Sequence, residues 1–125
     1  MPPLVLCAGM EKERLLRLSF LAMGLGIRVR PVEEARQGQT LAALCGLEAE
    51  KPSAAPAKAK GEMLVLAFFE DALLDRFLAA LRQNGLAVPL KAVLTPNNSR
   101  WTCAALYQEL KREAAAFASQ RGKQA

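Results

Sequence analysis

Leu4-Val5-Leu6-Cys7-Ala8 is the stretch that decides the fold, together with its counterpart Leu64-Val65-Leu66-Ala67. Each is a short, uninterrupted apolar run, which is typical of a strand that is covered by other elements and placed centrally in a sheet. Helical signals follow both runs, so strands alternate with helices along the chain. This alternation predicts an α/β fold, with two tandem β-α-β-α halves that form one four-stranded sheet packed by helices.

The helix after each apolar run is indicated by periodicity. In the second half, Leu74, Phe77, Leu78 and Leu81 recur at i, i+3, i+4 and i+7, which places them on one face of a helix. Asp71 is a candidate N-cap, and Asn-Gly at 84–85 supplies residue types that tolerate a left-handed C-cap. The matching helix of the first half runs over residues 11–23, with Leu15, Leu18, Leu21 and Ala22 as its apolar positions.

The strands expected after these helices, at residues 27–32 and 85–94, have the character of edge strands. The first alternates apolar and charged residues, and both contain a proline, Pro31 or Pro89, which cannot donate a ladder hydrogen bond. The inner strands are then residues 4–8 and 63–67. The sequence leaves open the relative direction of the two halves, and whether helices cover one face of the sheet or both.

The chain divides at residues 48–61, a low-complexity Ala/Pro/Lys segment without large apolar side chains, which predicts a flexible linker. We expect a single domain with a first half at 1–47, a second half at 62–119 and a frayed tail at 120–125. Each half ends in a helix for which a threonine, Thr40 or Thr102, is the expected N-cap. Trp101 and Leu106 then occupy the two positions of a hydrophobic staple.

Composition narrows the function. The chain of 125 residues contains no histidine, which removes the commonest general base and argues against an enzyme. Its three cysteines are far apart and show no metal-ligand spacing, so no metal, cofactor or disulfide is expected, and a reducing cytoplasm is the predicted location. The net charge of +5 is spread thinly and is not interleaved with aromatic residues, which argues against nucleic acid. The sequence predicts neither a membrane span nor a secretory signal.

The candidate ligand site is the polar loop between the last strand and the last helix. Loops at the carboxyl ends of strands, and the free N–H groups of a helix N-terminus, are the usual binding places in α/β proteins. The candidate residues for a small anion or other small ligand are Thr95, Asn97, Asn98, Ser99, Arg100, Trp101 and Thr102. A polar turn followed by a helix cap explains the same residues without a ligand.

Three further residues have two interpretations each. Cys103 is expected at the first position of the last helix, where the helix dipole lowers the pKa of a thiol, although helix packing is the simpler role. Phe68 and Phe69 follow the second inner strand, and they are either core residues or a surface patch for a partner.

The run Pro89-Leu90-Lys91-Ala92-Val93-Leu94-Thr95-Pro96, followed by Asn and then Trp101-Thr102, resembles a bacterial family of small proteins filed as domain of unknown function 3783. The start of the first half's last helix, Gln39-Thr40-Leu41, also fits that family, so the resemblance covers both halves and excludes the linker. It implies no activity, and Cys103 stands where the resemblance leads us to expect a larger apolar residue. The sequence as a whole favours a non-enzymatic protein-interaction or regulatory domain, with a protein partner or a homodimer through an edge strand or an exposed helix face. The alternative is a small-ligand site, binding or catalytic, at residues 95–102.

Overall fold

The computed structural model describes residues 1–52 and 61–124, with side chains described as far as Ser119. Residues 53–60 of the predicted linker lie outside the described residues. The elements, in chain order, are β1 (Leu4–Ala8), α1 (Lys12–Gly24), β2 (Arg28–Val32), the 3-10 turn η1 (Glu34–Arg36), α2 (Leu41–Leu44), β3 (Met63–Ala67), α3 (Asp71–Gln83), β4 (Leu90–Val93), the 3-10 turn η2 (Asn98–Arg100) and α4 (Cys103–Gln124).

The four strands form one mixed sheet in the order β2-β1-β3-β4, so the protein has an α/β fold with β1 and β3 as the inner strands, as predicted. The outer strands run parallel to their inner neighbours. The seam between β1 and β3, which the sequence left open, is antiparallel and places Leu6 opposite Val65.

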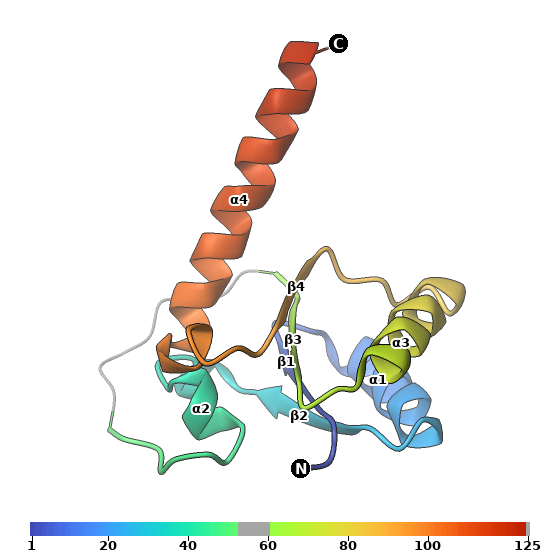
Figure 1. Ribbon diagram of the computed structural model, residues 1–125, viewed down its shortest axis with the longest axis vertical. Coiled ribbons are helices and arrows are strands. Elements are labelled where there is room, and N and C mark those ends of the chain that lie inside the picture. Colours follow the sequence, from blue (N-terminus) through green and yellow to red (C-terminus); the bar gives the residue numbers. More distant parts are fainter. Residues whose placement is uncertain (53–60, 125) are drawn as a thin grey trace.

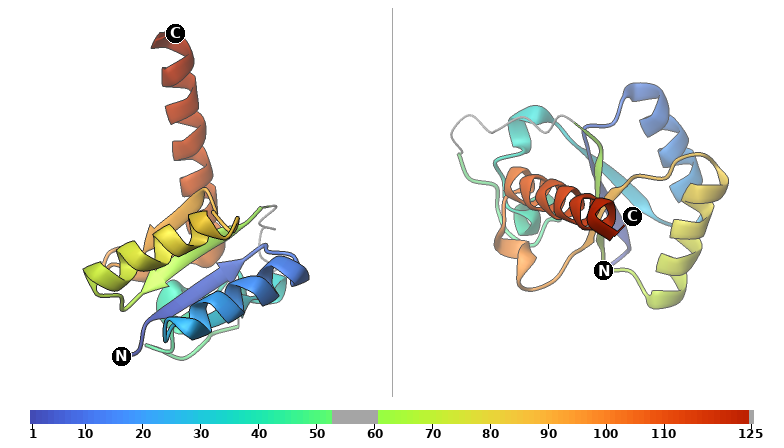
Figure 2. Two further views of the ribbon diagram at one scale, coloured as in Figure 1. Left: turned by 90° about the vertical axis from the view of Figure 1, so that its right-hand side faces the viewer. Right: turned by 90° about the horizontal axis from the view of Figure 1, so that it is seen from above.

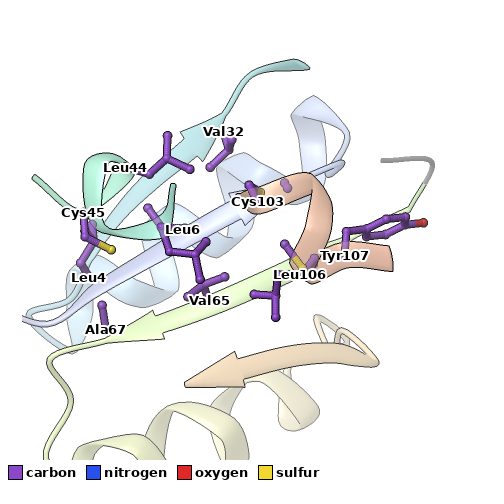
Figure 3. Close-up of a cluster of buried hydrophobic side chains, with 13 residues drawn as sticks. Leu4, Leu6, Val32, Leu44, Cys45, Val65, Ala67, Cys103, Leu106 and Tyr107 are labelled. Atoms are coloured by element: carbon purple, nitrogen blue, oxygen red, sulfur yellow. The ribbon is translucent and has the colours of Figure 1, made fainter. Parts of the chain in front are cut away.

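Helices cover both faces of the sheet, which settles the second open point. α1 and α3 lie side by side on one face, while α2 and the start of α4 cover the other (Figures 1 and 2). The inner strands are fully buried because alternate side chains face opposite layers. Leu6 and Val65 pack with α2 and α4, as Figure 3 shows, whereas Val5 and Leu66 pack beneath α1 and α3.

The element order of residues 4–44 recurs in residues 63–124. β1 and α1 start at positions 4 and 12, and β3 and α3 start at positions 63 and 71, so one constant offset in numbering relates the two pairs. At this offset each position of α1 has a matching position in α3. An origin of the two halves in an internal sequence repeat stays a prediction.

Two local predictions are wrong. The last strand is limited to Leu90–Val93 and does not extend over 85–94, because Gly85 takes the left-handed φ of 67° and Pro89 has no N–H for the ladder. Asp71 does not cap α3: it is the first residue of the helix, and the N-cap is Glu70, which forms no side-chain cap hydrogen bond.

α4 is the longest helix in the described chain, and it projects well beyond the sheet (Figure 1). Its first turns are anchored by Cys103, Leu106 and Tyr107, which are buried, and residues 111–119 are exposed. The helix continues to Gln124, and the predicted fraying of residues 120–125 stays a prediction. Among the described residues, no helix combines the length and apolar character needed to cross a membrane.

Candidate functional site

The loop between β4 and α4 is held together by its own side chains. The Thr95 N–H donates to Asn98 Oδ1 at 2.8 Å, and the Asn98 N–H donates in return to Thr95 Oγ1 at 3.0 Å. The Asn98 amide also donates to the Val93 carbonyl, and Ser99 Oγ donates to the Pro96 carbonyl. Three of the predicted ligand residues, Thr95, Asn98 and Ser99, are thus brought together as a closed turn.

The first turn of α4 already has hydrogen-bond acceptors for its N–H groups. Cys103 N donates to the Gln39 carbonyl at 3.0 Å, Ala104 N to the Gln37 carbonyl at 2.9 Å, and Ala105 N to Thr102 Oγ1 at 3.1 Å. The Leu41 N–H of α2 donates in turn to the Trp101 carbonyl, so the N-termini of the two helices pair with each other. An anion at this helix N-terminus would have to displace protein acceptors.

The other predicted ligand residues are more dispersed. Thr102 is the N-cap of α4, and Thr40 is the N-cap of α2, both as expected. Asn97 and Arg100 are exposed. Trp101 is 37% exposed and lines a shallow hollow with residues of the next turns of α4, among them Ala105 and Gln108. Its predicted staple contact with Leu106 stays a prediction.

Burial raises the pKa of each of the three thiols, which favours the helix-packing role of Cys103 over an activated thiol. Cys103 is the first residue of α4, but burial raises the pKa of its thiol to about 11. Burial, with a contribution from the nearby Glu62 carboxylate, raises the pKa of Cys7 to about 12, and burial also raises the pKa of Cys45. Desolvation causes the raised pKa of Cys103, and it acts in the direction opposite to the effect expected of a helix dipole. Within residues 1–52 and 61–124, no three His, Cys, Asp or Glu side chains converge as a metal-binding group.

An apolar hollow of about 390 Å³, here called the Phe68 hollow, opens beside this loop at the carboxyl ends of β3 and β4. Phe68 has a φ of 66°, a left-handed conformation that is strained for an aromatic residue. The matching position in the first half, Gly9, has a φ of 72°. The residues that line the hollow are Leu47, Phe68, Phe69, Val93, Leu94, Thr95, Pro96 and Ser99. Phe68 and Phe69 are half-buried, so they belong partly to the core and partly to this surface.

A comparison with protein families matches residues 62–117 to the family described as Domain of unknown function (DUF3783). Residues 62–117 are thus similar to the DUF3783 family, and the resemblance of the first half to that family stays a prediction. The matched segment contains β3, α3, β4, the 95–102 loop and most of α4. No curated protein and no solved structure matches the chain. The Phe68 hollow lies in the DUF3783 segment except for Leu47, and α1 lies outside that segment.

The outer face of α1 is a functional candidate that sequence reasoning missed. Leu16, Phe20 and Met23 are 59%, 66% and 69% exposed. Their spacing of i, i+4 and i+7 places them in one stripe, here called the α1 face. Periodicity assigned Leu15, Leu18, Leu21 and Ala22 to the buried side of this helix. The sequence signal that could have revealed the α1 face is that this assignment leaves three large apolar residues of the helix unassigned to the core.

The matching positions of α3, in the DUF3783 segment, are different. At the constant offset between the two halves, Leu16, Phe20 and Met23 correspond to Asp75, Ala79 and Arg82. Asp75 and Arg82 are exposed, charged side chains, as is normal on the outer side of a surface helix. The fold therefore does not require large apolar side chains at these positions.

Proposed function

We propose that this protein is a non-enzymatic protein-interaction domain that binds its partner through the α1 face. The observation that carries this proposal is the contrast between α1 and α3: two helices in matching places, one with an exposed apolar stripe and one without. An exposed apolar stripe gains free energy when a partner covers it, at roughly 25 cal/mol per Å² of buried apolar area. Contiguous exposed apolar residues of this kind mark interaction sites.

The edges of the sheet favour a helix face over strand addition as the means of binding. Arg28 N–H donates to the Pro3 carbonyl, so the backbone of residues 28, 30 and 32 faces β1 and that of residues 29 and 31 faces outward. Pro31 therefore removes a donor from the open edge of β2. By the same alternation Leu94 N–H faces β3, which places Val93 outward, and the Val93 carbonyl already accepts a hydrogen bond from the Asn98 amide. Each open edge of the sheet therefore lacks a free backbone group that a further strand would need for its hydrogen bonds.

The chemistry of the chain supports a non-enzymatic role. It has no histidine, and the raised pKa values of the three thiols keep them protonated at neutral pH. A protonated, buried thiol is a poor nucleophile. The polar side chains of the 95–102 loop are in large part used to close the loop and to cap α4.

Site-specific photo-crosslinking tests this proposal in living cells. A benzophenone-bearing amino acid is placed at Phe20, and the matched control carries it at Ala79 of α3. We expect a discrete polypeptide adduct from position 20 that disappears when Leu16→Asp is added, and none from position 79. Absence of an adduct at position 20, or equal adducts at both positions, would overturn the proposal. Thermal melts of the same variants verify that each one is folded.

The Phe68 hollow supports a second candidate function, the binding of a small ligand beside the 95–102 loop. Backbone strain such as that of Phe68 is concentrated at binding and switching sites, and this residue follows β3 at the ligand-binding end of parallel strands. A thermal-shift screen of nucleotides, phosphates, carboxylates and small apolar compounds tests it, since a ligand raises the melting temperature with the logarithm of its excess. A flat screen removes this candidate. A hit that Phe68→Gly abolishes, and that Phe20→Glu leaves unchanged, supports it.

A further inference from the structure

We infer that the partner bound at the α1 face is a second copy of this chain, with the two α1 helices antiparallel about a two-fold axis near Phe20. This inference rests on the proposed function, because it names the occupant of the same surface. A two-fold axis makes the contact isologous, so each copy must supply both the projecting group and the surface that receives it.

The shape of the α1 face meets that requirement. Two hollows flank the helix: one of about 550 Å³ lined by Lys12, Glu13, Leu15, Leu16 and Ser19, and one of about 410 Å³ lined by Leu4, Ser19, Met23, Ile27, Arg28, Val29 and Arg30. Ser19 belongs to both hollows, and the largely exposed ring of Phe20 stands next to it in sequence. In an antiparallel dimer, Phe20 of each copy lies over the hollows around Ser19 of the other copy. The two-fold axis makes this contact occur twice.

Ser19 suits the centre of a dry helix contact. Its side chain is small, which lets two helix backbones approach closely. Its hydroxyl already donates to the Leu15 carbonyl at 2.8 Å, so covering it leaves no unsatisfied polar group. Apolar side chains on either side of Ser19, Leu16 and Met23, then pack across the axis.

The charges at the two ends of the face favour the antiparallel arrangement of two copies. Glu13 lies two helical turns before Phe20, which is about 10 Å at the helical rise, and Arg28 lies past the other end of the helix. Both side chains are exposed, and Glu13 forms no ion pair within the part of the chain that the structure describes. Two-fold pairing brings Glu13 of each copy toward Arg28 of the other. A parallel pairing would oppose like charges at both ends.

The remaining basic groups around the face are compatible with this pairing. The Arg17 and Arg30 guanidinium groups donate to carbonyls of their own chain, at Asn84 and Leu44, and these contacts are shorter than the 3.4 Å contact of Arg28 with the Pro2 carbonyl. Lys12 is exposed beside Glu13, and its long stem lets the ammonium group turn to water at the rim.

The length of α1 limits the size of an interface between two copies. The 13 residues of α1 make a helix about 20 Å long at the usual helical rise. Together with the end of β2, this length gives an interface at the small end of the usual range. Such a small interface is typical of weak association, so the fraction of dimer should depend on the protein concentration.

Sedimentation velocity over a concentration series tests the inference on the full chain. The weight-average mass should rise from 13.5 kDa toward twice that value. Phe20→Glu should give a monomer at every concentration, and Leu16→Lys should act in the same direction as an independent variant. The matched control Ala79→Glu should leave the dimer unchanged. Circular dichroism and thermal melts show which variants are folded.

Charge reversal tests the orientation. Glu13→Arg alone and Arg28→Glu alone should each weaken the dimer on the order of ten-fold, since two exposed ion pairs become two repulsive pairs. The double variant Glu13→Arg/Arg28→Glu should restore the wild-type affinity, and failure to restore it overturns the antiparallel arrangement.

The two proposals fail in different ways. A wild-type chain that stays monomeric throughout, while position 20 crosslinks to another polypeptide in cells, overturns the second-copy inference and leaves the proposed function standing. A dimer that Phe20→Glu does not disrupt, with no adduct at position 20, overturns both.

Discussion

Replacing Gly9 with alanine should be one of the most damaging small changes in this protein. Gly9 follows β1 with a φ of 72°, and a Cβ built there lies 2.0 Å from the Gly61 carbonyl oxygen. The left-handed conformation costs a residue with a Cβ about 1–2 kcal/mol. The overlap with backbone forces β1 and the chain entering β3 apart, which costs roughly a further 1–3 kcal/mol. The reduced freedom of the unfolded chain returns about 0.4–1 kcal/mol.

The net expectation for Gly9→Ala is a loss of about 2–4 kcal/mol in the free energy of unfolding, a large part of the roughly 5–15 kcal/mol typical of a domain. Two other glycines separate the contributions. Gly26 has a φ of 73° but no atom within 4 Å of the added Cβ, so Gly26→Ala should cost only about 1 kcal/mol. Gly24 closes α1 with ordinary φ and open space, so Gly24→Ala should raise stability by about 0.5 kcal/mol.

Urea unfolding followed by circular dichroism measures all three variants at one temperature, and the midpoint and slope together give the free energy. The order of stability should be Gly24→Ala, wild type, Gly26→Ala and Gly9→Ala. If Gly9→Ala were no less stable than Gly26→Ala, then residues 9 and 61 would not meet, and the described β1–β3 seam would be wrong at this end.

Three further outcomes are expected. Arg14 donates to both carboxylate oxygens of Glu62, at 2.6 and 3.0 Å, and these side chains are about one quarter exposed, so Arg14→Ala should cost about 1 kcal/mol in denaturant unfolding and less at high salt. The thiols of Cys7 and Cys103 have folded pKa values of about 12 and about 11, above the ordinary 9.0, so the unfolded chain loses these protons first. The stability that these two thiols contribute should therefore be fully present below about pH 9 and fall above it, until about pH 11 for Cys103 and about pH 12 for Cys7, and Cys103→Ala should flatten that slope in unfolding curves collected across this range. Thr102→Ala removes the N-cap hydrogen bond of α4 and should lower the melting temperature by the equivalent of about 1 kcal/mol, whereas a variant as stable as the wild type would show that the cap is dispensable.

The inner strands could be predicted because they are buried on both faces. Residues 4–8 and 63–67 have no polar side chain apart from the weakly polar thiol of Cys7, and this leaves a central strand as the natural interpretation. The direction of the seam could not be predicted from the same residues. A parallel and an antiparallel pairing of β1 with β3 bury the same side chains, and the choice depends on where the rest of each half lies.

The candidate site was only partly predictable. The sequence predicts that the loop at 95–102 lies between a strand and a helix, as it does, but the hydrogen bonds within the loop depend on how its side chains are arranged in the folded chain. Nothing in the spacing of Thr95 and Asn98 tells whether their polar atoms bond each other or a ligand. At Cys103 burial and the helix dipole act in opposite directions on the pKa, and only the packing of α4 on the sheet shows that the thiol is buried. The α1 face was missed because apolar periodicity identifies the buried side of a helix. It gives no information on the residues of the exposed side.

The antiparallel seam between β1 and β3 makes each half of the chain depend on the other half. Leu6 stands opposite Val65, the middle residues of two strands that come from different halves of the chain. Either half alone would expose the edge of its inner strand, β1 or β3, which pairs with the other half in this structure. A chain of residues 62–117 alone would leave β3 without the β1 strand that pairs with it. Joining β1 and β3 in one polypeptide makes their pairing intramolecular, at an effective concentration in the millimolar range.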